Sequence, residues 1–211
     1  MFVLPLGASV VAAAFAVGAW RAGTSPALRI WAYALGQFAI ASAVLAWGVG
    51  FGWGEFGYRI YYLFGAVLNV PWLGLGTIWL LTPRWTGLLA TFLVGSASAA
   101  AGALTLSEPL LPAAAAALAT EAIPSGSRVM PDVVRALSRW FSITGSVAVL
   151  AGLVWSIVRR RRHALGLGLL AAGVVVVGGA SEFARLGFVL PFSVGLAVGV
   201  AVMYAGFLRT R

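Results

Sequence analysis

The sequence of 211 residues contains no cysteine, no lysine and a single histidine. Without cysteine, the chain can form no disulfide framework, no thiolate metal site and no redox-active thiol. All 14 basic residues are arginines, which excludes a lysine Schiff base with an aldehyde such as retinal. The one histidine, His163, cannot supply a bis-histidine haem site or a histidine cluster for zinc within one chain.

Charge is also scarce, because only 9% of the residues are charged whereas 62% are hydrophobic. The mean hydropathy is +1.00. A water-soluble domain contains about 25% charged residues, so this composition excludes a soluble globular protein. A membrane-spanning helix needs about 20 apolar residues, since the hydrocarbon core is about 30 Å thick and a helix rises about 1.5 Å per residue.

Charged residues bound a series of such apolar runs. The expected spans are Phe2–Trp20, the uncharged runs within 29–55, 59–84 and 84–108, and then Trp140–Val158, Ala164–Ser181 and Leu186–Leu208. The runs are continuously apolar instead of alternating, which excludes a membrane β-barrel. We therefore predict an all-α fold, a polytopic membrane helical bundle with about seven transmembrane helices, as a single domain over residues 1–211. The first span lacks the positively charged start of a signal peptide, and we expect it to be retained.

Arginine placement predicts the orientation of the helices. Alternating the spans puts nine arginines on one side, namely Arg21, Arg29, Arg84, Arg159, Arg160, Arg161, Arg162, Arg209 and Arg211, and five on the other. Because cytoplasmic loops carry the excess of basic residues, the N-terminus is expected outside and the C-terminus inside, in the cell inner (plasma) membrane. The run Arg159–Arg162 is expected to bind anionic lipid headgroups. Arginines that flank apolar spans indicate no nucleic-acid surface.

One connection, at about 107–137, is long and is expected on the outer side. Its Ala-rich part, Pro112 to Glu121, predicts a short helix, and Pro131 followed by Asp132 predicts the start of the next long helix. Long loops in compact domains are commonly functional or disordered. The alternative is a lid that only covers the helix ends.

Two uncharged polar residues lie deepest in the predicted spans. They are Gln37 and Asn69, and Asn69 precedes Pro71 by two residues. A proline has no N–H and disturbs the helix before it, so an amide beside Pro71 can coordinate a polar solute at mid-depth. The alternative for Asn69 is an interhelical hydrogen bond that only positions its helix. Trp72, also near mid-depth, can line a cavity or simply pack in the core.

Two acid–base pairs stand near the outer ends of spans. Glu55 and Arg59 are four residues apart, and Glu182 and Arg185 are three apart, so each pair falls on one helical face. Such pairs can line an outer vestibule. The alternative is a pair of interfacial ion pairs, each with a contribution below about 1 kcal/mol.

No pattern for catalysis, a metal site or a cofactor occurs, and we expect no enzyme activity. The leading hypothesis is a permease- or channel-like passage for a small solute through Asn69, Gln37, Pro71 and Trp72. The alternative is a sensor, accessory or scaffold subunit that binds lipid or a partner protein. Small residues at 95–102 and at Gly195 and Gly199 suit close helix packing, either within the bundle or between copies of the chain.

Overall fold

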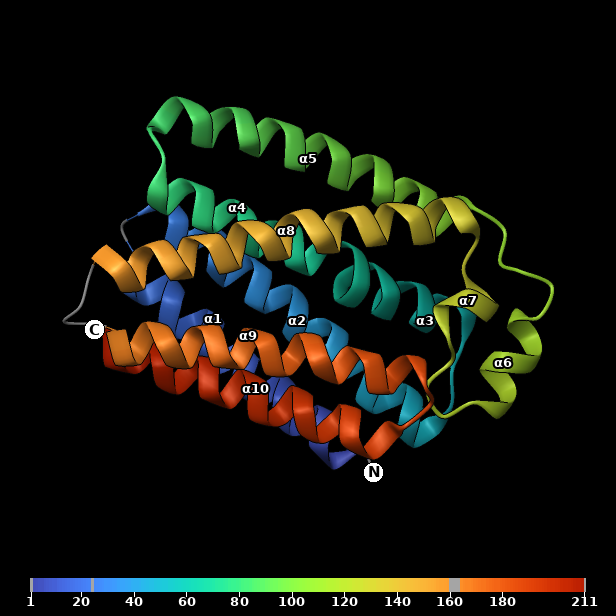
Figure 1. Ribbon diagram of the computed structural model, residues 1–211. Coiled ribbons are helices and arrows are strands. Elements are labelled where there is room, and N and C mark those ends of the chain that lie inside the picture. The colour runs from blue at the N-terminus through green and yellow to red at the C-terminus, as the bar shows by residue number, and fades with distance from the viewer. Residues whose placement is uncertain (1, 24, 160–163, 211) are drawn as a thin grey trace.

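The computed structural model describes residues 2–23, 25–159 and 164–210 (Figure 1). Within these ranges the chain is helical, with no strand. The elements are α1 (Val3–Ala22), α2 (Pro26–Phe51), α3 (Glu55–Tyr62), η1 (Leu63–Leu68), α4 (Asn69–Leu81), α5 (Arg84–Ser107), α6 (Ala114–Thr120), α7 (Gly126–Val129), α8 (Asp132–Arg159), α9 (Ala164–Arg185) and α10 (Val189–Thr210).

Local sequence sets several of the helix ends. The hydroxyl of Ser25 accepts a hydrogen bond from the N–H of Leu28 at 3.4 Å, and Pro26 follows in the first turn of α2. Gly52 follows the last residue of α2, and its φ of +96° lies in the region that favours glycine. α8 begins at Asp132, which confirms the start that the sequence predicts after Pro131.

Six helices among the described residues are long and apolar enough to cross a membrane. They are α1, α2, the continuous helix Glu55–Leu81, α5, Asp132–Ser156 of α8 and Val189–Arg209 of α10. The described apolar part of α9, Gly168–Ala184, is shorter. These helices confirm the expected all-α fold and are compatible with a membrane bundle, whereas the count of about seven crossings and the orientation stay predictions. The Ala-rich helix of the long connection is also confirmed, since α6 lies at Ala114–Thr120.

The long helices form a ring. α1, α2, α4, α8, α9 and α10 each contact the next, and α10 returns to α1. α5 contacts chiefly α4 and lies at the edge of the bundle (Figure 1). Residues 108–131, which we call the cap, carry α6 and α7 and lie at the end where α1 begins (Figure 1). We call this end the cap end.

The described charged side chains lie near the two ends of the bundle. Arg21, Arg29, Arg84 and Arg209 lie at the end opposite the cap, whereas Arg59, Arg128, Arg135 and Arg139 lie at the cap end. The acidic residues all belong to the cap end, and they are Glu55, Glu108, Glu121, Asp132 and Glu182. Arg160, Arg161, Arg162 and His163 lie outside the described residues, as does the side chain of Arg159.

The helix formed by α3, η1 and α4, which we call the central pass, packs very closely against α8. A Cβ atom placed on Gly145 of α8 would lie 2.6 Å from the carbonyl oxygen of Val70. One placed on Gly74 would lie 3.0 Å from the Cα of Gly145. Because glycine has no side chain, the two backbones approach to a separation that no other residue permits.

Other predicted small-residue contacts divide into two kinds. Gly195 and Gly199 of α10 face Ala180 and Val177 of α9, so they serve packing within the bundle. Around Gly95 and Gly102 of α5 nothing lies within 4 Å of an added Cβ atom. The glycines of α5 therefore provide a matched contrast to those of the α4–α8 contact.

Replacement of Gly145 by alanine is expected to lower the free energy of unfolding by roughly 1–3 kcal/mol, because the new methyl group overlaps the backbone of Val70. Gly95→Ala adds the same methyl group in open space and should cost nothing, since alanine favours the helix. Thermal unfolding in detergent compares the two variants. Equal midpoints for them would show that α4 and α8 are not in such close contact.

Candidate functional site

Gln37 and Asn69 are the only glutamine and the only asparagine of the chain, and both are buried about halfway along a helical pass. The exposed fraction is 2% for Gln37 and 6% for Asn69. The interior of a bilayer offers no water to satisfy such groups, so each must find its partners within the protein.

Asn69 has such a partner. Its Nδ2 donates a hydrogen bond to the carbonyl oxygen of Ala34 on α2 at 2.8 Å. One turn further along, the indole Nε1 of Trp31 donates to the carbonyl oxygen of Leu73 at 3.1 Å. These two bonds join α2 to α4, so the interhelical role of Asn69 is present in the structure. Its role in binding a solute stays a prediction.

Gln37 has none. Neither its Nε2 nor its Oε1 makes a hydrogen bond, and among the described residues the only other buried side-chain atom in this condition is Oγ of Ser193. A buried polar group without a partner costs about 1–3 kcal/mol. An amide that carries this cost at mid-depth is a candidate for binding something that the chain itself does not supply.

Neighbouring contacts locate the Gln37 side chain. Ala34, three residues earlier, accepts the bond from Asn69. Ala41, four residues later, lies 3.3 Å from the position that a Cβ of Gly65 in η1 would take. Positions separated by three and four residues share a helical face, so Gln37 lies on the face of α2 that packs against η1 and the start of α4. We call this contact the α2–η1 seam.

η1 is a π-helical segment, a wide turn that is rare and frequent at functional sites. Pro71 follows it and has no N–H to donate into the preceding turn. Ala66 lies five residues before Pro71, the spacing of a π-helical hydrogen bond. The Ala66 carbonyl instead accepts the hydroxyl of Ser138 on α8 at 2.8 Å, with that of Ser142 at 3.5 Å.

Trp72 lies on the outer side of the central pass, away from the ring. Its Nε1 donates to the hydroxyl of Ser98 on α5 at 3.1 Å, and the ring of Tyr33 packs edge-on against it with centroids 4.6 Å apart. Trp72 therefore fastens α5 to α4. Of its two predicted roles, packing is the one that these contacts support.

The centre of the ring holds a cavity of about 30 Å³. Every ring helix contributes to its lining, with Phe15, Trp31, Leu73, Val149, Leu170 and Met203 as one residue from each. The lining is apolar, and the volume is close to that of a single water molecule in the liquid. This cavity is far smaller than the roughly 300–1,000 Å³ of a site for an organic ligand.

The Glu55–Arg59 pair forms at the cap end as the spacing predicts. Nη2 of Arg59 lies 2.9 Å from Oε1 of Glu55. Arg59 is 7% exposed, and its Nη1 donates to the carbonyl oxygen of Thr105 near the end of α5 at 2.7 Å. A cation suits the negative end of a helix, so Arg59 holds α5 against α3 instead of facing an open vestibule.

The second predicted pair is described only in part. Glu182 lies near the end of α9 and is exposed, whereas the side chain of Arg185 lies outside the described residues. The structure does not bring Glu182 to Glu55 and Arg59 in one described site. The outer vestibule of four charged residues therefore stays a prediction.

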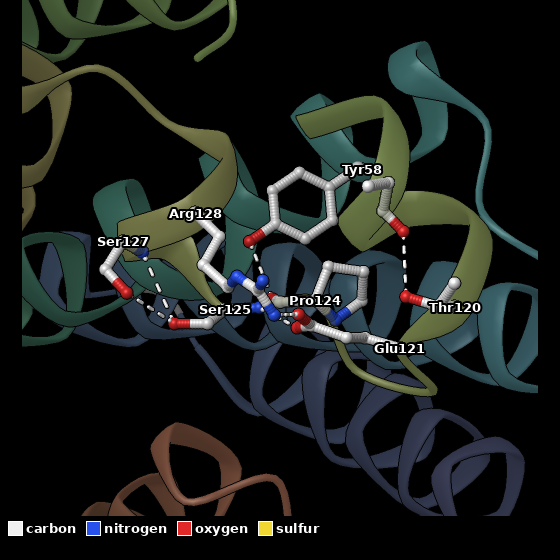
Figure 2. Close-up of polar contacts among 8 residues, drawn as sticks. Tyr58, Thr120, Glu121, Pro124, Ser125, Ser127 and Arg128 are labelled. Carbon is white, nitrogen blue, oxygen red and sulfur yellow. Dashed lines mark hydrogen bonds and ion pairs between the residues drawn. The ribbon is translucent and has the colours of Figure 1, made fainter. Parts of the chain in front are cut away.

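Aromatic side chains of α3 and of the connection before it bind the cap, a contact that sequence reasoning missed. The hydroxyl of Tyr58 donates to the carbonyl oxygen of Pro124 at 2.9 Å (Figure 2). The indole of Trp53 donates to the carbonyl oxygen of Ala122 at 2.9 Å. Tyr58, 1% exposed, also packs among Val129 and Met130. The sequence signal was the run of aromatics at 53–62, which membrane-interface preference alone explains equally well.

The comparisons give no relative for this arrangement: no known protein family, no curated protein and no solved structure matches the chain. Within the part of the chain that the structure describes, no group of three or more His, Asp or Glu side chains is placed to hold a metal ion. The α2–η1 seam, with the unpaired amide of Gln37, is the candidate site that the geometry leaves.

Gln37→Met and Asn69→Leu should change stability in opposite directions. Methionine matches the length of glutamine and removes an unpaired amide, so the free energy of unfolding should rise by about 1 kcal/mol. Asn69→Leu loses the bond to Ala34, and the free energy of unfolding should fall by roughly 0.5–2 kcal/mol. Denaturant or thermal unfolding in detergent measures both. A loss of stability in Gln37→Met would mean that the amide has a partner within the protein.

Proposed function

We propose that the chain is a non-enzymatic integral membrane protein that passes a small solute through its helix bundle at the α2–η1 seam. The observation that supports this function is the unpaired amide of Gln37 at mid-depth. A group with this desolvation cost is expected where a ligand supplies the missing hydrogen bonds. The proposal also includes α9 as a membrane-spanning helix, so that the chain crosses the membrane seven times.

The chemistry of the seam favours a neutral solute. A free amide offers a donor and an acceptor side by side, so it suits a molecule that carries both. No charged residue occurs between Arg29 and Glu55 or between Arg59 and Arg84. An ion at the depth of Gln37 would therefore have no compensating charge, at a cost of several kcal/mol.

The seam is closed in the present conformation, because both polar atoms of the Gln37 side chain are covered by protein. Passage therefore requires α2 to separate from the central pass. η1 and Pro71 are the natural place for that change, since a wide turn next to a proline has fewer helical hydrogen bonds to break. Many transporters bind their solutes at such interrupted helices near the bilayer midplane.

The proposal includes an orientation and a location. The end with the arginines faces the cytoplasm and contacts anionic lipid headgroups, and the cap end faces outside, in the inner (plasma) membrane of a cell. Nine of the 14 arginines in the sequence fall on the proposed cytoplasmic side, which supports this orientation.

Flux through purified protein in liposomes tests the function. Urea, formamide and glycerol are suitable probes, because each is small, neutral and both donates and accepts hydrogen bonds. Stopped-flow light scattering should show at least one of them entering faster than into empty liposomes, while K⁺ stays at background. Gln37→Met should return that rate to the level of empty liposomes, although the variant is the more stable protein.

Thr144→Val is the matched control for the flux measurement. Thr144 is exposed on α8 and its hydroxyl bonds to Trp140 of its own helix, so the variant should keep the parental rate. If none of the three probes enters faster than into empty liposomes, or if Gln37→Met keeps the parental rate, passage at the seam is refuted.

The second candidate function is that of an accessory or scaffold subunit, possessing no path of its own. The ring centre favours it, since the cavity there is apolar and has a volume close to that of one water molecule. Native mass spectrometry after mild extraction should then show a defined complex larger than the 21.8 kDa chain, and the liposomes should stay as tight as empty ones.

A further inference from the structure

Ile123 of the cap is held in place at the carbonyl groups on both sides of it. Trp53 donates to the carbonyl oxygen of Ala122 and Tyr58 to that of Pro124, each at 2.9 Å. Tyr58 belongs to the start of the central pass and Trp53 to the short connection before it, and both lie far from the cap along the chain. The two bonds lie on the peptide groups before and after the Ile123–Pro124 peptide, so together they fix the position and the direction of Ile123.

The turn that carries Ile123 is also closed by its own polar groups. Oε2 of Glu121 accepts the backbone N–H of Ser125 at 3.0 Å, and the same carboxylate pairs with Arg128 (Figure 2). The turn therefore keeps its shape as a unit. The bonds from Trp53 and Tyr58 decide where that unit sits.

The side chain of Ile123 is buried, at 6% exposed, and belongs to the apolar core at the cap end of the ring. The buried members of that core come from four ring helices, for example Ala8 of α1, Leu45 of α2, Ala180 of α9 and Phe192 of α10. A loop side chain is therefore part of the core between these four helices. It is the one described cap side chain that joins the cluster as a buried member.

Aromatic residues that pack on this core also lie along the face of α2 that leads to Gln37. Trp53 and Tyr61 pack against the core that contains Ile123. Along α2, Trp53 lies against Gly48, and Ala41 meets the position of Gly65 below it. Gln37 follows one turn deeper on the same face. A solute that followed this face of α2 from the cap end would pass Trp53 and Tyr61 before it reached the seam.

We propose that residues 121–125 form a hinged plug whose Ile123 side chain shuts the cap end of the ring and which is latched by Trp53 and Tyr58. Opening breaks the two latch bonds and withdraws Ile123 as the turn moves away with its Glu121 contacts intact. The role of the plug as a gate to Gln37 rests on the proposed function. The latch itself is defined by contacts that do not depend on it.

Because the chain has no cysteine, Ile123→Cys creates the only thiol and reports on the plug directly. A charged, membrane-impermeant maleimide added to the cap side of proteoliposomes should label this thiol slowly. Ser127→Cys, exposed on the cap, is the reference for fast labelling. Adding Tyr58→Phe to Ile123→Cys removes one latch bond and should raise the labelling rate roughly tenfold, as loss of one such bond shifts an equilibrium.

Tyr33→Phe is the matched control, since Tyr33 is exposed on α2 and packs on Trp72, away from the cap. It should leave the labelling of Ile123→Cys unchanged. Trp53→Phe should act in the same direction as Tyr58→Phe. Unfolding is separated from opening by a second thiol, Val200→Cys, deep in the same core, which should stay unlabelled in every variant if only the plug moves.

The outcomes distinguish the plug from the transport function. With Trp53 and Tyr58 both present, labelling of Ile123→Cys as fast as that of Ser127→Cys would refute the plug. An unchanged labelling rate in both Trp53→Phe and Tyr58→Phe would also refute it. Faster labelling together with faster urea entry supports plug and passage alike. Faster labelling without any probe flux supports the plug and counts against the proposed passage.

Discussion

The structure depends on one constraint, that polar groups inside a membrane must be satisfied by the protein itself. The central pass meets it with side-chain donors that cross between helices. Asn69 donates to the Ala34 carbonyl of α2, and Trp31 of α2 donates to the Leu73 carbonyl of the central pass. Ser138 of α8 donates to the Ala66 carbonyl, so hydrogen bonds join both α2 and α8 to the central pass. Arg59 does the same for α5 through Thr105. Against this background the free amide of Gln37 is an exception that calls for a chemical reason.

Features that depend on local sequence were predictable. Apolar runs set the helices, Pro131 and Asp132 set the start of α8, and the i, i+4 spacing set the pair of Glu55 with Arg59. The rest depends on residues distant in the chain. Pro71 alone predicts a disturbed helix, but not that the disturbance is a π-helical segment whose Ala66 carbonyl accepts the Ser138 hydroxyl of α8. Likewise nothing local distinguishes Ile123 from other loop residues, because its burial comes from four helices and two aromatic donors.

The bundle keeps its polar and apolar interiors apart. The axis of the ring is lined by groups such as Leu73 and Met203 and is nearly filled. The unpaired amide lies instead between two neighbouring helices of that ring. A route at the seam therefore depends on α2 moving relative to the central pass. The close glycine contacts between α4 and α8 hold the central pass against α8, so α2 would move while the central pass stays in place.

Closure of the ring has a consequence for biosynthesis. Phe15 of α1 packs on Tyr204 and Phe207 of α10, with ring centroids 5.4 and 5.0 Å apart. At about 5–20 residues per second, roughly ten to forty seconds pass between synthesis of these partners. Until then one side of α1 has only lipid or a chaperone to face. A chain that stalls before α10 displays that unpaired side, which gives the quality-control machinery of the cell a physical mark of incompleteness.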